Sequence, residues 1–208
     1  MINLFVDTSY KTLFVALLKD NNLIDKIQIM SEFNFSETMI PTLNKILCDN
    51  NLKAADINKI FAIVGPGSFT GIRIGLTAAK TLAYVLNIPI VALSSLEFMA
   101  TTTCNTDYII PFIDARHNMV FGGVYDKDGN PLIPDSYCFL DKLVSSLNGS
   151  YTFVTFDEKI VDNFVIPKYD VCKIVMRHIN DSGENCHRIK PNYLKKTEAE
   201  EKLNDTRV

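Results

Sequence analysis

Several patterns typical of metal, redox and nucleic-acid sites are missing from this chain of 208 residues. The three histidines are never four residues apart, so a helical zinc site of the H-E-x-x-H type is excluded. The five cysteines are scattered without a C-x-x-C pair, and we expect reduced structural thiols. A net charge of −3 gives no basic field that would hold nucleic acid by itself. We therefore expect neither a metal nor a cofactor.

Membrane and secretion signals are missing as well. The start, Met1-Ile2-Asn3-Leu4-Phe5-Val6, has no basic region and no cleavage site of small residues. No segment reaches the roughly 18 consecutive apolar residues that a membrane helix needs. We expect a cytoplasmic protein without membrane contact. A hydrophobic content of 47% is ample for a core, in one large domain or in two small lobes.

The most informative stretch is 65–73, which reads Gly-Pro-Gly-Ser-Phe-Thr-Gly-Ile-Arg. An apolar run at 60–64 precedes it and helical spacing follows, so the pattern predicts a strand, a glycine turn and a helix. Gly65 and Gly67 allow a positive φ or a close backbone approach, and Ser68 or Thr70 can cap the helix. With Arg73 one turn in, the free N–H groups of the helix could bind an anion. Equally, the glycines could simply build a tight turn. The spacing matches neither the P-loop nor the dinucleotide fingerprint.

Two long helices are expected in the first half. The second, 69–87, has a buried stripe and a face with almost no side chain, formed by Gly71, Gly75 and Ala78. The first, capped by Ser36 and running to about residue 50, carries apolar groups that include Met39, Leu43 and Ile46. Pro41 is awkward in this helix, so we expect the helix to start later or to bend there.

The opening pattern returns half a chain later. Phe-Val-Asp-Thr-Ser at 5–9 aligns with Phe-Ile-Asp-Ala-Arg at 112–116, and each is followed by an apolar strand and an Asx/Gly turn. This favours two lobes of related topology with an aspartate-led turn on each side of a cleft, although two unrelated hairpins could share the pattern. We expect lobes at 1–103 and 104–194, the second reduced, and a charged tail at 195–208 that is frayed or disordered.

Two carboxylates, Asp7 and Asp114, lead these turns. They could bind a metal or act as a general base, but the interpretation we favour is that each accepts N–H bonds of its own turn. Arg73 and Arg116 could bind anions or pair with these aspartates. Thr8 and Ser9 stand where a phosphate loop would offer glycine. A nucleotide bound between the lobes would need a Gly-Gly loop in the second lobe to receive its adenine. Residues 151–208 hold a single glycine and so contain no such loop. We therefore expect a degenerate nucleotide site.

Together these motifs resemble the TsaB (YeaZ) family. The resemblance runs in order from residue 2 to about 125 and returns near residue 191. The residues that carry it are Asp7-Thr8-Ser9, the stretch from Gly65 through Arg73 to Gly75, Ser94-Ser95-Leu96-Glu97, Ile113-Asp114-Ala115-Arg116 and Pro191-Asn192-Tyr193-Leu194. It implies an α/β fold of the actin-like ASKHA (ribonuclease H-like) class, and a role in making threonylcarbamoyladenosine in tRNA.

In that family the catalytic paralogue is TsaD, which binds metal through two histidines on its first long helix. The corresponding helix here begins Ser36-Glu37-Thr38-Met39-Ile40-Pro41 and has none, so the resemblance implies a scaffold without catalytic residues. It also implies a heterodimer with TsaD, a contact with TsaE that the short second lobe puts in question, a homodimer when TsaD is missing, and tRNA contact only through the complex. The expected interface residues are Met39, Leu43, Ile46, Gly71, Gly75, Ala78 and Leu82. Gly75→Leu should then abolish TsaD binding and leave the fold intact.

Two other functions compete with this scaffold. An actin-like ATP-dependent phosphotransferase would use Asp7 or Asp114 to hold its metal. A metalloprotease, a label once attached to the wider family, would need bound zinc without spaced histidines.

Overall fold

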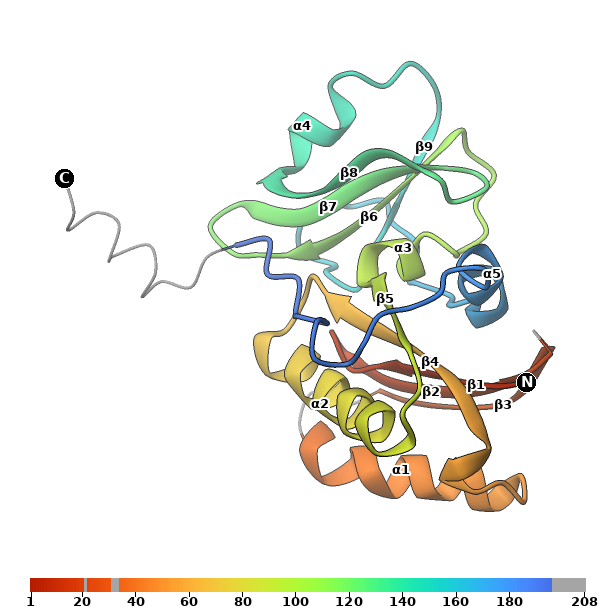
Figure 1. Cartoon of the computed structure of the whole chain (residues 1–208). Coiled ribbons are helices and arrows are strands. Elements are labelled where there is room, and N and C mark those ends of the chain that lie inside the picture. Colours follow the sequence, from red (N-terminus) through yellow and green to blue (C-terminus); the bar gives the residue numbers. More distant parts are fainter. Residues whose placement is uncertain (21, 31–33, 196–208) are drawn as a thin grey trace.

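Two β-sheets form the centres of two lobes in the computed structural model, which describes residues 1–20, 22–30 and 34–195 (Figure 1). The first sheet has the order β3-β2-β1-β4-β5 and the second the order β8-β7-β6-β9. The first comprises β1 (Ile2–Asp7), β2 (Thr12–Lys19), β3 (Asn22–Met30), β4 (Ile57–Gly65) and β5 (Ile90–Ser94). The second comprises β6 (Tyr108–Asp114), β7 (Met119–Asp126), β8 (Pro131–Phe139) and β9 (Tyr151–Val154).

The two sheets repeat one topology. In the first, β1 pairs antiparallel with β2 and parallel with β4. In the second, β6 pairs antiparallel with β7 and parallel with β9 in the same way. The prediction of two lobes with related topology is therefore confirmed. The second sheet has one strand fewer, because no described strand takes the place that β5 has beside β4.

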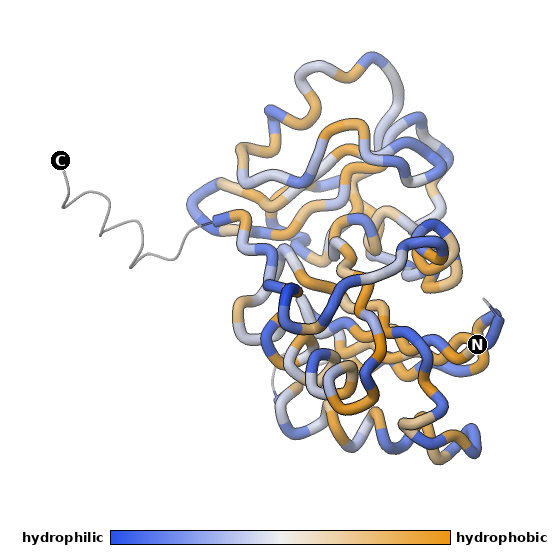
Figure 2. The backbone as a smooth tube through the Cα atoms, in the orientation of Figure 1, coloured by the Kyte–Doolittle hydropathy of each residue, from blue (hydrophilic) through white to orange (hydrophobic). Residues whose placement is uncertain are grey.

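The helices are α1 (Phe35–Asp49), α2 (Phe69–Leu86), α3 (Ser95–Met99), α4 (Leu140–Val144) and α5 (Val171–Arg177), with a 3₁₀ turn at Ala54–Asp56. Strand side chains alternate between the two faces of the first sheet. Leu4 and Val6 pack with α1 and α2 on one face, whereas Phe5 packs with α3 and α5 on the other. Hydrophobic stretches accordingly follow the strands of both lobes, and hydrophilic ones follow many of the loops (Figure 2).

One expectation about α1 is wrong, and one of the two alternatives given for Pro41 is excluded. The N-cap residue is Asn34, in the left-handed region and without a side-chain cap, and Ser36 lies inside the helix. The helix does not start after Pro41 but runs through it. In a regular helix the N–H of residue 41 would donate to the carbonyl of Glu37, but proline has no N–H. Both Pro41 and Glu37 are exposed. Water can therefore satisfy that carbonyl, which lowers the cost of a proline inside the helix.

The lobe boundary also needs correction, because residues 171–194 pack on the first lobe. In α5, Val171, Ile174 and Val175 join the cluster around Phe5 and Phe14. Farther along, the Asn192 amide donates to the Val64 carbonyl over 2.7 Å. Helical periodicity shows that α5 has an apolar face but not which sheet it covers. The expected tail is described only at Lys195, and residues 196–208 lie outside the described part of the chain.

Candidate functional site

The turn after β1 is buried and bound to α2. Asp7, Thr8 and Ser9 are each at most 2% exposed. The Thr8 hydroxyl donates to the Gly71 carbonyl over 2.6 Å and accepts from the Gly75 amide over 2.9 Å. The hydroxyl of Thr8 is thus used within the fold, in two hydrogen bonds to α2.

The glycines of the 65–75 stretch are explained by this contact. A Cβ atom on Gly67 would lie 2.2 Å from the Ser9 carbonyl oxygen, and one on Gly71 would lie 2.1 Å from that of Thr8. Backbone φ values of +114° at Gly65 and +153° at Gly67 add a second reason for glycine. Ser68 is the N-cap, and its hydroxyl accepts from the Gly71 amide over 3.2 Å. Thr70 is exposed and is not the cap. This geometry supports the tight-turn interpretation.

Asp7 and Asp114 hold their turns in the same way. The Ser9 amide donates to Asp7 over 2.7 Å, and the Arg116 amide donates to Asp114 over 2.7 Å. Each aspartate thus accepts a hydrogen bond from the amide two positions later in its own turn, as the interpretation that we favoured predicts. Arg73 and Arg116 form no ion pair with either aspartate within the described residues.

A third aspartate connects the two turns, and sequence reasoning missed it. Asp157 follows β9 and accepts the Asp114 amide over 2.8 Å and the hydroxyl of Tyr10. The Lys11 ammonium lies 3.3 Å from the same carboxylate. Because Tyr10 and Lys11 follow Asp7 in the first lobe, Asp157 fastens one turn to the other. In the repeated topology β9 corresponds to β4. Asp157 lies three residues beyond β9, just as Ser68 lies three residues beyond β4, and this correspondence is the only sequence signal for Asp157.

Burial sets the charge state of Asp7. Desolvation raises the pKa of this carboxyl from 3.8 to about 6, although the bonds from Ser9 lower it. The folded chain therefore binds this proton more tightly than the unfolded chain. Asp7 is protonated in the fold below about pH 6 and carries a buried charge above it.

We expect stability to fall as pH rises from about 4 to 6, by up to about 3 kcal/mol from this group alone. Asp7→Asn keeps an acceptor for the Ser9 amide and carries no charge. Urea unfolding between pH 4 and 8 should show the variant more stable than the wild type at pH 7, with the gap closing toward pH 4. Parallel pH profiles for the two proteins would contradict this.

An open cavity of about 790 Å³ adjoins the second turn. Its wall includes Asp114 and Arg116, together with His117, Lys159 and the exposed ring of Phe139. Carboxylates and cations alternate here, so neither sign of charge dominates. Over the described chain, no three His, Cys, Asp or Glu side chains are grouped so that they could hold a metal ion.

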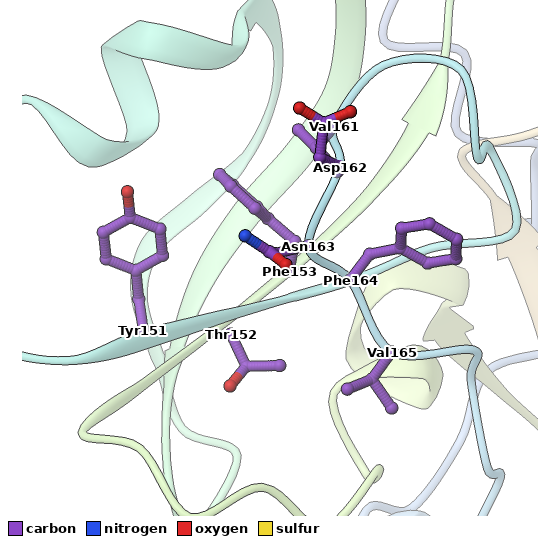
Figure 3. Close-up of a pocket in the computed structure, with 8 residues that line it drawn as sticks. All are labelled: Tyr151, Thr152, Phe153, Val161, Asp162, Asn163, Phe164 and Val165. Atoms are coloured by element: carbon purple, nitrogen blue, oxygen red, sulfur yellow. The ribbon is translucent and has the colours of Figure 1, made fainter.

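Another cavity, of about 740 Å³, lies beside β9 (Figure 3). Its wall runs from Tyr151, Thr152 and Phe153 to the segment 161–165. None of the residues predicted for the turns or the helices lines it.

Most of the expected interface residues lie in this chain's own core. Met39, Leu43, Ile46, Gly71, Gly75 and Ala78 are buried, and Leu82 packs partly buried against the same core. A Cβ atom on Gly75 would lie 2.4 Å from the Thr8 hydroxyl, so Gly75→Leu would disturb the fold itself. The small-residue face of α2 receives the chain's own first turn, a contact that helical spacing cannot show.

Other residues occupy the exposed faces of α1 and α2. Ile40 is 53% exposed, Tyr84 66% and Val85 72%. At the start of α2, the Phe69 ring stacks on Tyr193, with centroids 4.6 Å apart. The Arg73 guanidinium lies 3.8 Å from the centre of the Phe69 ring. None of these apolar side chains is among the expected interface residues, although their positions away from the buried stripes were the available signal.

Comparison with known proteins identifies the family. The family model described as "TsaD: tRNA N6-adenosine threonylcarbamoyltransferase" matches residues 30–168, more than half of the chain. A Bacillus subtilis protein named "tRNA threonylcarbamoyladenosine biosynthesis protein TsaB" is 40% identical over 144 residues, 67% of this chain and 63% of that protein. The chain belongs to the TsaB (YeaZ) family. The Escherichia coli protein of the same name is 30% identical over 130 residues, 61% of this chain and 56% of that protein. The matches to these two TsaB proteins thus span less than two thirds of their length.

A solved structure titled "YeaZ from Pseudomonas aeruginosa" superposes with a TM-score of 0.78 at 19% identity. The match covers 93% of this chain and 99% of that one. The actin-like fold class expected for a TsaB-family chain is confirmed. The second lobe is reduced relative to the first, but the coverage shows that it is not shortened relative to YeaZ.

Proposed function

We propose that this chain is a non-catalytic subunit in the synthesis of threonylcarbamoyladenosine in tRNA, and that it binds TsaD through the exposed faces of α1 and α2. The names of the TsaB relatives and of the matching family model support a role in this pathway. The partner is the TsaD-type paralogue that the family resemblance implies. TsaE remains a further expected partner, and tRNA is reached through the complex.

The exposed apolar side chains of α1 and α2 carry this proposal. Ile40, Tyr84 and Val85 are more than half exposed on helices whose other sides are buried in the core. Isolated apolar groups are common on protein surfaces, but these three lie on two helices that contact each other. A partner helix that covers them would remove their apolar surface from water. The same face would serve a homodimer when TsaD is missing.

The filled first turn supports a non-catalytic role. Thr8 and Ser9 are buried, and Thr8 exchanges two hydrogen bonds with α2 at the place where a phosphate loop would meet its ligand. A nucleotide could enter there only if these bonds were broken. The chain's contribution is then the surface that it presents to its partner.

A binding experiment with the TsaD protein of the same organism tests the proposal. Ile40→Asp and Val85→Asp each place a charge at an exposed position on the α1/α2 surface proposed here to bind TsaD. Together they should weaken binding by about 100-fold or more in calorimetry, because an unpaired charge would be buried. Leu132→Asp, at a 50% exposed position on β8 in the other lobe, is the matched control and should bind as the wild type does. Unchanged binding by the α1/α2 double variant would overturn the proposal.

A further inference from the structure

His178 ends α5 with a carboxylate on each ring nitrogen. Its Nε2 lies 2.8 Å from Glu97 Oε1, and its Nδ1 lies 2.8 Å from Asp181 Oδ2. Glu97 belongs to α3, whereas Asp181 lies three residues beyond His178 on the segment that leaves α5. The ring thus joins α3 to the turn that follows α5.

This geometry specifies a protonation state. An ionised carboxylate only accepts hydrogen bonds, and a neutral imidazole has a single N–H. Both contacts are hydrogen bonds at once only when both ring nitrogens carry a proton. A cation at this position also faces the carboxyl end of α5, where positive charge is favourable.

The surrounding charges act in both directions. Glu97 and Asp181 favour the cation. Asp135 of β8 is a further carboxyl group that lines the same cavity as His178. Arg177, whose Nη1 lies 3.2 Å from Glu97, and Lys59 of β4, whose Nζ donates to the Ile179 and Asp181 carbonyls, oppose the cation. The bond to Glu97 is the largest influence and raises the pKa of His178 above 6.5, although burial lowers it.

We propose that His178 is a proton-operated latch, whose imidazolium clamps Glu97 and Asp181 and fixes the turn after α5 against α3. When the ring loses a proton, one of its two contacts with the carboxylates is no longer a hydrogen bond. Asp181 is the side that opens, because its side chain is 55% exposed and water can solvate it, whereas that of Glu97 is 14% exposed and keeps the remaining N–H. The opened turn leads to Gly183 and Glu184, where the Glu184 backbone pairs with Ile90 at the edge of β5. The latch thus governs how firmly this segment is held.

The direction of the pH effect follows from the geometry. The clamp is complete below the pKa of an unfolded histidine, about 6.5, and is lost as pH rises through the higher pKa of the folded state. Amide-exchange protection from Asp181 to Glu184, corrected for the intrinsic exchange rate, should fall about tenfold for each unit by which the pKa of His178 in the closed clamp exceeds its pKa with Asp181 released. Nitrogen-15 spectra of the ring should show both nitrogens protonated below this pKa and the Nε2–H tautomer above it.

Three variants of the full chain test the latch. His178→Gln should give a protection profile independent of pH in this segment. Asp181→Asn, at an exposed position that the fold tolerates, should lower the pKa of His178 and shrink the effect. His187→Gln, on the same segment but outside the clamp, should keep the wild-type profile. A His178 ring that titrates at or below pH 6.5, or a wild-type profile in the Asp181→Asn protein, would overturn the latch even if His178→Gln failed to fold.

Discussion

Gly75→Leu is expected to lose more than about 4 kcal/mol of folding stability, enough to leave much of the chain unfolded. The first added carbon would lie 2.4 Å from the Thr8 hydroxyl and 3.4 Å from Val6 Cγ1, inside a buried contact. The Gly75 amide would also lose its 2.9 Å bond to Thr8, because the turn and the helix must separate. Neither the buried turn nor the helix backbone has room to move aside. Urea unfolding followed by circular dichroism measures the loss.

The control for this prediction lies two residues away. Thr77→Leu adds a similar side chain on the exposed side of the same helix and should change stability by less than about 0.5 kcal/mol. A double-mutant cycle sharpens the test, because the Gly75 contact is with the Thr8 side chain and the Gly71 contact is with the Thr8 backbone. Thr8→Ala should relieve Gly75→Ala but not Gly71→Ala. Equal relief of both would contradict the packing described above.

Asp157→Ala is expected to cost about 4 kcal/mol, because it leaves several polar groups between the lobes without their partner. The carboxylate is 13% exposed, and it accepts from the Asp114 amide and from Tyr10 while it pairs with Lys11. Removing one member of a largely buried charged pair typically costs about 3–5 kcal/mol. Thermal or urea unfolding measures this loss.

Two further substitutions at acidic positions separate charge from hydrogen bonding. Asp157→Asn keeps an acceptor and should cost about half as much as the alanine change. Asp162→Ala, at an exposed position in the same connection, should be close to neutral. If Asp157→Ala proved no more destabilising than Asp162→Ala, Asp157 would not be the fastening between the two turns.

Much of the fold could be read from local patterns. The strand at 60–64, the helix that Ser68 caps and the recurrence of the aspartate-led hairpin all follow from apolar patterns, turn residues and capping, which act over a few positions. The family could also be recognised, because the stretch from Gly65 to Gly75 is so specific. The residues of the exposed helix faces could not be predicted in this way. Burial depends on what the rest of the chain places against a helix, and periodicity does not carry that information.

The amino-acid sequence alone determined the strands, the glycine turn and the duplicated hairpin, since each is specified by residues close together in the chain. Only the tertiary structure decided that the small-residue face of α2 receives Thr8, that α5 covers the first sheet, and that Asp157 connects the two turns. Each of these contacts joins residues that lie more than sixty positions apart or belong to different lobes. The packing of the whole chain determines them, and no local pattern encodes that packing.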